Sequence, residues 1–252
     1  MPAKISAVII SKNEVDRISR CIQSLLPLTD DIVVIDNGST DGTVKLAQNL
    51  GAKVYNIKWK GYGPTKNYGH DKAQNDWIIS LDADEFLSGG LIEEIKALKL
   101  ESTCVYKIDR QNYYLGKKIN HSGWSPDWVF RIFNKTEVRW NESLVHEKLI
   151  IPEAFKVVKL KHKLIHHSYR SIKDHKEKTE KYAKLRAKIW IKTNKYPSQF
   201  KRWFGPVFKG FKSYILKLGF LDGAEGWTIA KMNAYLVKRQ IYHYDKSKAS
   251  KT

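Results

Sequence analysis

The first hundred residues alternate short apolar runs with segments of helical periodicity, and this alternation constrains the fold more than any other feature. Apolar runs rich in β-branched side chains occur at residues 5–10, 31–36, 52–57 and 77–81. Amphipathic segments expected to form helices separate them, at residues 14–26, 40–50 and 64–74. Near-continuous apolar strands joined by such helices predict an α/β fold with a mainly parallel sheet flanked by helices.

Polar segments follow three of these strands directly. They are Ser11–Glu14, Asp36–Ser39 and Asp82–Glu85. Ligands of open parallel sheets bind beyond the carboxyl ends of the strands, so we expect the binding site there. The paired carboxylates Asp82 and Asp84 suit Mg²⁺ or Mn²⁺ shared with phosphate oxygens, although a solvated turn would use the same residues. Asp36 can bind a ribose or a base edge, form an Asx turn before a helix, or do both.

Several classes of protein are excluded by what the chain lacks. The turn after the first strand reads SKNEVDR, without the G-x-G-x-x-G loop of a dinucleotide site, and no Walker sequence occurs. The same turn also lacks the Gly-rich, Arg-containing loop of nucleotidylyltransferases. No apolar stretch approaches the roughly 20 residues of a membrane-spanning helix. The N-terminus is expected to be a first strand of a cytoplasmic protein, and Cys21 and Cys104 to be buried as small apolar side chains.

The pattern changes after residue 103. Residues 103–167 form short apolar runs with aromatic interruptions, which predict an antiparallel extension of the sheet. Helices are then expected at residues 171–194 and 206–218, and from a capping box at residues 222–225 to residue 244. We therefore expect a catalytic domain over residues 1–167, with halves 1–100 and 101–167, and a basic helical extension over residues 168–252.

The net charge of +19 is confined to the last part of the chain. Residues 1–155 hold 20 basic and 20 acidic residues, whereas residues 156–252 hold 25 and 6. Such asymmetry indicates an anionic partner, either a membrane surface or a nucleic acid, unless the basic face is merely solvated. Aromatic side chains at helical spacing beside lysines favour the membrane, so we expect residues 200–221 to dock on the inner face of the cytoplasmic membrane and no nucleic acid to bind.

Ordered motifs over about residues 4–150 together resemble one known family. They read ISAVIISKNE, DDIVVIDNGSTDGT, GPTKNYGHDKAQNDWIISLDADE, GWSPDWVFRIF and WNESLVHEKL. This set resembles an inverting family 2 glycosyltransferase of the GT-A fold, and is similar to the bacterial lipopolysaccharide core glycosyltransferases. The segment FGPVFKGFKSYILKLGFLDGAEGW resembles the same subgroup more loosely.

The resemblance implies a role for each matching residue. It implies a nucleotide-sugar donor, with uridine diphosphate as the carrier, bound by Ser11, Asn13, Glu14, Asp36, Gly38, Ser39, Lys66, Asn67 and Asp82. Asp84 would hold a divalent metal, Mn²⁺ or Mg²⁺, on the diphosphate, with Asp82 beside it and His146 completing the metal site.

Inverting transfer requires one general base at the acceptor hydroxyl. We expect this base to be Asp127, with Glu147 and Glu142 as alternatives, while Asp127 could instead cap a helix. The expected reaction transfers a sugar, for example from UDP-glucose, to a saccharide acceptor such as the lipopolysaccharide core or another lipid-linked glycan. Polyprenyl phosphate and a peptide side chain remain alternative acceptors, and a non-enzymatic basic nucleic-acid-binding protein is the alternative from another class.

Overall fold

The computed structural model describes residues 4–142, 148–194 and 197–249. The chain forms two compact units, each built from two segments. The first comprises Met1–Arg110 and Asp127–His166, and the second comprises Gln111–Pro126 and His167–Thr252. The second unit therefore includes residues 111–126 in addition to the C-terminal part of the chain.

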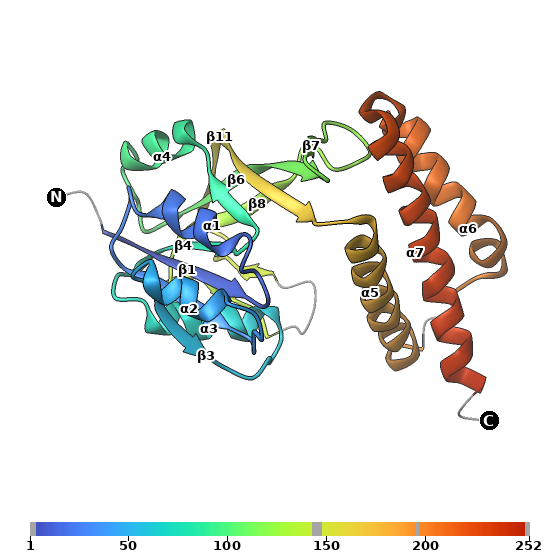
Figure 1. Cartoon of the computed structure of the whole chain (residues 1–252), viewed down its shortest axis with the longest axis horizontal. Coiled ribbons are helices and arrows are strands. Elements are labelled where there is room, and N and C mark those ends of the chain that lie inside the picture. The colour runs from blue at the N-terminus through green and yellow to red at the C-terminus, as the bar shows by residue number, and fades with distance from the viewer. Residues whose placement is uncertain (1–3, 143–147, 195–196, 250–252) are drawn as a thin grey trace. The chain divides into compact units, whose positions relative to one another are not determined.

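The main sheet has nine strands, with the order β3-β2-β1-β4-β8-β6-β11-β5 and β7 paired with β6 (Figure 1). The strands are β1 (Ile5–Ser11), β2 (Ile32–Asp36), β3 (Lys53–Asn56), β4 (Trp77–Asp82), β5 (Glu85–Leu87), β6 (Cys104–Tyr114), β7 (Lys117–Lys118), β8 (Trp128–Asn134) and β11 (Lys156–Tyr169). Strands β1 to β4 pair in parallel, and β8 joins β4 in the antiparallel sense. Strands β9 (Arg139–Trp140) and β10 (Leu149–Ile150) form a separate antiparallel pair. The predicted parallel sheet with an antiparallel extension is confirmed.

Helices cover both faces of the parallel strands because the side chains of each strand alternate between two apolar cores. Ile5, Ala7 and Ile9 of β1 enter a core with helices α1 (Ile18–Leu25), α2 (Thr43–Asn49) and α4 (Gly89–Lys96). Val8 and Ile10 face the opposite core, which α3 (Tyr62–Lys72) covers. Cys21 and Cys104 are buried and free, as predicted.

All three predicted helix starts in the first unit are wrong by a few residues, and α2 begins at Thr43 rather than at residue 40. Helix α1 begins at Ile18 rather than at residue 14, because Asn13 has a left-handed φ of 55° and residues 13–15 donate their backbone hydrogen bonds to the loop after β2. Helix α3 begins at Tyr62, which places Pro64 within its first turn, where a backbone N–H has no helical acceptor.

The second unit contains the helices α5 (Ile172–Lys192), α6 (Gln199–Phe211) and α7 (Gly223–Ala249). A π-helical turn at Lys212–Leu216 and a 3₁₀ turn at Gly219–Asp222 connect α6 to α7. Among the residues described, no helix combines the length and apolarity needed to cross a bilayer.

Two sequence expectations for this unit need correction. The helix predicted from residue 206 begins at Gln199, where the Ser198 hydroxyl accepts a hydrogen bond from the Lys201 N–H, and it carries Pro206 inside. The carboxylates of the expected capping box contact the segment after β6 instead. Asp222 accepts hydrogen bonds from residues 120–122, and Glu225 pairs with Lys117 at 2.8 Å.

Candidate active site at the carboxyl ends of the parallel strands

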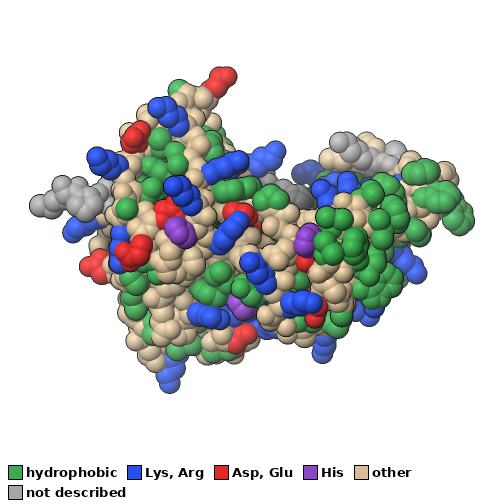
Figure 2. Space-filling view, turned by 90° about the horizontal axis from the view of Figure 1, so that it is seen from above, with side chains coloured by type: hydrophobic (Ala, Val, Ile, Leu, Met, Phe, Trp, Pro, Cys, Tyr) green, Lys and Arg blue, Asp and Glu red, His purple; other side chains and the backbone are tan. Residues whose placement is uncertain are grey.

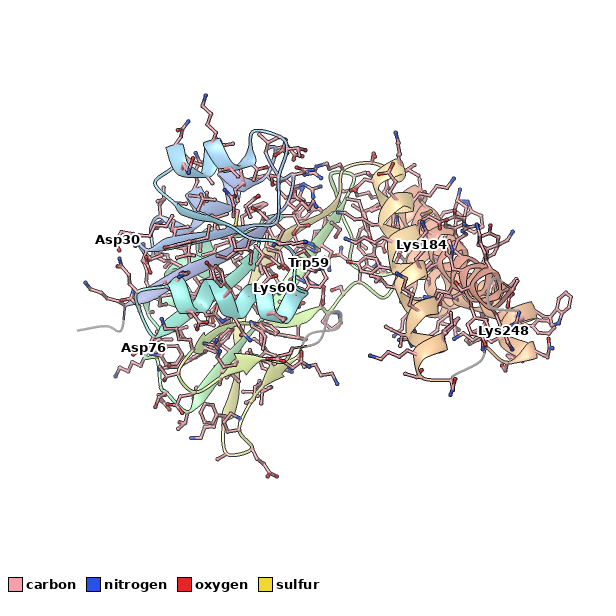
Figure 3. All side chains as sticks on the ribbon, turned by 90° about the horizontal axis from the view of Figure 1, so that it is seen from below. Asp30, Trp59, Lys60, Asp76, Lys184 and Lys248 are labelled. Carbon is pink, nitrogen blue, oxygen red and sulfur yellow. The ribbon has the colours of Figure 1, made fainter. Side chains whose placement is uncertain are left out.

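The strand register brings the three polar segments to one edge of the sheet. Ser11 lies opposite Asp36, and Ile10 lies opposite Asp82. Figure 3 shows Trp59 and Lys60, in the segment between β3 and α3, near this edge. Asp30 and Asp76, which precede β2 and β4, lie at the opposite edge in the same view. The parallel topology therefore brings the three predicted polar segments together.

Asp36 organises the loop that follows β2. Its buried carboxylate accepts hydrogen bonds through Oδ2 from the N–H groups of Gly38 (2.9 Å) and Ser39 (2.8 Å). The hydroxyl of Ser11 donates to Oδ1 at 3.3 Å. Gly38 has a φ of +83°, a conformation that glycine adopts without strain. The Asx turn expected at Asp36 is confirmed, because the backbone of Gly38 and Ser39 folds back onto the Asp36 carboxylate.

The loop after β1 is tied to the loop after β2. Asn13 donates its N–H to Ser39 Oγ and accepts the Thr40 N–H at Oδ1, both at 2.8 Å. The Glu14 N–H donates to Thr43 Oγ1 at 2.8 Å. The predicted nucleotide-facing residues Ser11, Asn13, Glu14, Asp36, Gly38 and Ser39 therefore lie together in two interlocked loops.

Asp82 lies between two cations. Its Oδ1 is 3.5 Å from Lys66 Nζ, and its Oδ2 accepts a hydrogen bond from Arg131 Nη2 at 3.0 Å. Burial opposes ionisation of Asp82, but the positive charges of Lys66 and Arg131 outweigh it and hold the pKa of this carboxyl below its usual range. Oδ1 is buried and has no hydrogen-bond partner in the described part of the chain. Asp82 is therefore a carboxylate that two neighbouring cations keep ionised.

Glu85 is fully buried and links the aspartate pair to β6 and β8. Its Oε1 accepts hydrogen bonds from Arg131 Nη2 (2.6 Å) and Arg110 Nη1 (3.0 Å), and its Oε2 accepts the Asp82 N–H (3.2 Å). A buried carboxylate is stable only when it is paired, so the two guanidinium groups account for its position. Sequence reasoning did not assign roles to Glu85, Arg110 or Arg131.

Asp127, the predicted base, is part of the same network. Arg110 donates to Asp127 Oδ2 from Nε at 2.9 Å, with Nη2 at 2.8 Å from the same oxygen. The Asp127 N–H donates to Asp109 Oδ1 at 2.7 Å. Asp127 immediately precedes β8, so the alternative that it caps a helix is wrong. A series of hydrogen bonds therefore connects the aspartate motif with the expected acceptor side, running from Asp82 through Glu85 and Arg110 to Asp127.

Asp84 contacts two groups that sequence reasoning missed. Its Oδ2 lies 3.7 Å from Arg17 Nη1 and 3.6 Å from His166 Nε2. His166 belongs to β11, where antiparallel pairing with β5 places it opposite Glu85. The sequence held no sign of this pairing, because β5 and β11 are separated by about 80 positions and register between distant strands is not encoded in either strand alone.

Of the other predicted residues, Lys66 and Asn67 also contact Trp140, Glu142 is exposed, and two lie outside the described residues. Asn67 exchanges hydrogen bonds with the backbone of Trp140, at 2.8 and 3.0 Å. Lys66 is buried beside the Trp140 ring, with Nζ 4.8 Å from its centroid. Glu142 is exposed. His146 and Glu147 lie outside the described residues.

The donor atoms around Asp84 fit a hard divalent ion only in part. In the described ranges, no group of three or more His, Cys, Asp and Glu side chains is arranged to hold a metal alone. However, Mg²⁺ commonly takes only one or two carboxylates and completes its shell with phosphate and water oxygens. The Asp84–His166 pair supplies one carboxylate and one imidazole 3.6 Å apart, which is a donor set within this smaller requirement.

The chain is similar in sequence to known glycosyltransferases. Residues 6–152 match the model of "Glycosyl transferase family 2". An uncharacterized glycosyltransferase of Rickettsia conorii is 32% identical over 89% of this chain and 84% of its own length. The lipopolysaccharide core biosynthesis glycosyltransferase LpsC of Rhizobium meliloti is 28% identical over 87% of this chain and 82% of its own.

The fold is also similar to that of a solved structure. The crystal structure of Staphylococcus aureus TarS aligns with a TM-score of 0.52 at 14% identity, and the alignment covers 90% of this chain and 55% of TarS. At this identity the likeness concerns the fold, which is the GT-A fold expected from the sequence motifs. The chain belongs to glycosyl transferase family 2 and is a glycosyltransferase.

Proposed function

We propose that this enzyme transfers a sugar from a nucleoside-diphosphate sugar to a saccharide acceptor with inversion at the anomeric carbon. The observation that carries the proposal is the hydrogen-bonded connection from Asp82 through Glu85 and Arg110 to Asp127. It joins Asp82 of the aspartate motif and one further carboxylate suited to a base within a single network, and Asp84 lies two residues after Asp82. Inverting transfer needs these two functions and no covalent intermediate.

The interlocked loops after β1 and β2 support nucleotide binding at this site. Asp36 and Ser11 lie side by side at the strand ends, and the loop carrying Gly38 and Ser39 offers backbone close to a ligand. In the proposal, Asp36, Asn13 and Glu14 contact the base and ribose of uridine diphosphate. Lys66 and Asp82 face the ribose or the sugar, and Asn67 stays a predicted donor-side residue.

A divalent ion, Mn²⁺ or Mg²⁺, held by Asp84 with Asp82 and His166, would neutralise the charge that develops on the departing diphosphate. The chain's own groups prepare that position. Arg17 places a further positive charge 3.7 Å from Asp84, and Arg131 and Lys66 keep Asp82 ionised. Imidazole beside carboxylates favours Mn²⁺ over Mg²⁺. His146 stays a prediction for the same role.

Asp127 would take the proton of the acceptor hydroxyl as its oxygen forms the new bond to the anomeric carbon. The bond from that carbon to the diphosphate oxygen breaks at the opposite face, and the nucleoside diphosphate leaves with the electron pair. Arg110 orients the carboxylate through two donors to Oδ2. Glu142 and Glu147 stay the alternative bases.

The relative LpsC supports a lipopolysaccharide core saccharide as acceptor, and UDP-glucose is the first donor to test. We place the reaction at the inner face of the cytoplasmic membrane, where a lipid-linked acceptor is presented. Polyprenyl phosphate and a peptide side chain are the alternative acceptors.

The test is donor binding and turnover against a panel of nucleotide sugars with Mn²⁺, Mg²⁺ or EDTA. Asp84→Asn should abolish metal-dependent binding of the preferred donor. Asp127→Asn should keep donor binding and lower transfer by about 10²- to 10⁴-fold. Asp76→Asn, an exposed carboxylate at the opposite sheet edge, is the matched control and should change neither. Absence of binding to every nucleotide sugar would refute the proposal. Undiminished transfer by Asp127→Asn would refute Asp127 as the base and leave Glu142 and Glu147 as the candidates, and product anomer analysis decides the stereochemistry.

A further inference from the structure

Helix α6 exposes a continuous apolar face. Its members lie at helical spacing on one side, and each is between 49% and 76% exposed: Phe200, Trp203, Phe204, Val207, Phe208 and Phe211. We call these six residues the aromatic face. Leu216, Leu218 and Leu221 extend it along the turns that follow. Soluble monomers rarely expose a contiguous apolar patch of this size, and such patches usually mark an interaction surface.

The rest of α6 is occupied by packing within the helical unit, so the aromatic face has a fixed orientation. A Cβ atom added at Gly205 would lie 3.3 Å from Val237 of α7, which shows how closely the two helices approach. Arg202 forms two 2.8 Å hydrogen bonds with Asp245 of α7. Lys201 Nζ lies 4.4 Å from the ring centroid of Trp190 in α5. Lys201, Arg202 and Gly205 therefore face the unit, and the large apolar residues point away from it.

The surroundings of the aromatic face are positively charged. Residues 181–221 include eleven Lys and Arg residues and no Asp or Glu. Lys209, Lys212 and Lys217 are exposed along α6 and the following turn, and Lys231 lies 5.6 Å from the ring centroid of Trp227. Figure 2 shows hydrophobic side chains gathered over the helical unit, on the right of the view, with Lys and Arg side chains around them.

The aromatic face and the positive charge around it together indicate which partner would cover this surface. A second copy of the chain would bring one acid-free basic segment against another, so the charges would repel. A single-stranded nucleic acid uses aromatic rings for stacking, but the aliphatic side chains of Val207, Leu216 and Leu221 offer no such platform. An anionic bilayer accommodates both features, because apolar side chains enter the acyl boundary while lysines remain among the headgroups.

We propose that α6 lies in the interface of an anionic bilayer, with the aromatic face inserted and Lys209, Lys212 and Lys217 at the lipid phosphates. A helix of 13 residues is about 20 Å long, shorter than the hydrocarbon core of about 30 Å, so it lies in the membrane plane and does not span it. Trp203 is the most exposed member and is suited to the headgroup region. The role of this contact in presenting a lipid-linked acceptor rests on the proposed function, whereas the contact itself does not.

The experiment measures co-sedimentation of the full chain with vesicles of phosphatidylglycerol and phosphatidylcholine, or of phosphatidylcholine alone. Wild type should bind the anionic vesicles at least tenfold more tightly than the neutral ones. Phe200→Ser/Trp203→Ser/Val207→Ser should lose at least tenfold in binding to the anionic vesicles. The three side chains are exposed, so their loss leaves the packing of α6 on α7 unchanged. Ile150→Ser/Ile172→Ser, which alters exposed apolar residues elsewhere, is the matched control and should bind like wild type.

A second readout reports insertion directly. Brominated acyl chains should quench the tryptophan fluorescence of wild type more than that of Trp203→Phe. The difference in quenching between the two proteins reports the contact of Trp203 with the acyl chains. Equal vesicle binding by wild type and the triple variant, equal binding to both vesicle types, or no quenching difference would overturn the proposal. So would a lipid-free dimer that the triple variant dissociates, because the second copy would then be the occupant.

Failure of this proposal is distinguishable from failure of the proposed function. The triple variant should bind and hydrolyse a nucleotide sugar in solution as wild type does, and Asp84→Asn should bind vesicles as wild type does.

Discussion

Arg110 contacts two carboxylates at once: its Nε and Nη2 lie 2.9 and 2.8 Å from Asp127 Oδ2, and its Nη1 lies 3.0 Å from Glu85 Oε1. Asp127 is therefore oriented by a residue that is itself fixed by a fully buried carboxylate. Because Glu85 also accepts the Asp82 N–H, the same arrangement sets Asp127 relative to the aspartate motif. Arg110 is a positioning residue for the proposed base.

The first prediction concerns this contact. Arg110→Lys keeps the charge but loses the planar fork that binds both carboxylates, so we expect kcat to fall about 10- to 100-fold with an unchanged KM for the donor. The measurement is steady-state kinetics against donor and acceptor separately, with the pH profile of kcat. Arg139→Lys, in the exposed pair with Asp71, is the control and should keep wild-type kinetics. A matching rise in donor KM would assign Arg110 to donor binding instead.

The second prediction tests the place of His166 beside Asp84. His166→Ala should weaken Mn²⁺-supported nucleotide binding by about tenfold or more and reduce any preference for Mn²⁺ over Mg²⁺, because imidazole is the softer ligand. Calorimetric titration of uridine diphosphate with each metal measures both effects. His162→Ala removes a histidine of the same strand that pairs with Glu94, and it should leave binding unchanged. Equal losses in the two variants would point to a disturbance of β11 and not to metal binding.

The third prediction is a pH dependence of stability. Burial, helped by the charges of Arg139 and Lys66, lowers the pKa of His70 from 6.5 to about 3. The unfolded chain therefore binds this proton more readily than the folded chain, and stability falls as the pH drops below 6.5. Between pH 7 and pH 5 this loss amounts to about 2 kcal/mol.

His70→Leu tests this dependence, because it removes the titrating ring that lies 5.3 Å from the Phe133 ring. Urea unfolding at pH 7 and pH 5 should give a smaller difference in unfolding free energy for the variant. Identical pH dependence in both proteins would show that His70 does not titrate as a buried group.

The fourth prediction concerns Asp222, whose buried carboxylate accepts the N–H groups of Asn120 and His121 and the hydroxyl of Ser122. Asp222→Ala leaves these donors without their acceptor and should cost about 2 to 3 kcal/mol of stability. Amide hydrogen exchange should accelerate at residues 120 and 121. Exchange at Gly38 and Ser39, which donate to Asp36, serves as the internal reference and should not change.

Sequence patterns predicted the parallel half of the sheet because local information determines it. Apolar runs and turn residues located β1 to β4, and parallel pairing then placed Ser11, Asp36 and Asp82 at one edge without further knowledge. Glu85 and Arg131 stand in the motifs noted in the sequence, but their contact with each other and the position of His166 were missed, since these residues meet through antiparallel pairing between distant strands. Predicted helix starts were wrong where tertiary contacts compete with helix propensity. At residues 13–15, for example, the backbone N–H groups donate to side chains of residues 39–43 after β2.

Each of the two units is built from two separate segments of the sequence, and this affects how a truncated protein should be designed. The family model ends at residue 152, yet residues 111–126 within it belong to the unit completed by the C-terminal helices. Tyr114 and Ile119 bury their side chains against Ile229, and Asp222 fixes the residues just beyond them. A fragment that stops after residue 167 would keep every motif of the family. It would lose Ile229, against which Tyr114 and Ile119 of the β6–β7 region pack. The region that matches the family model and the compact units of the structure are therefore different stretches of chain.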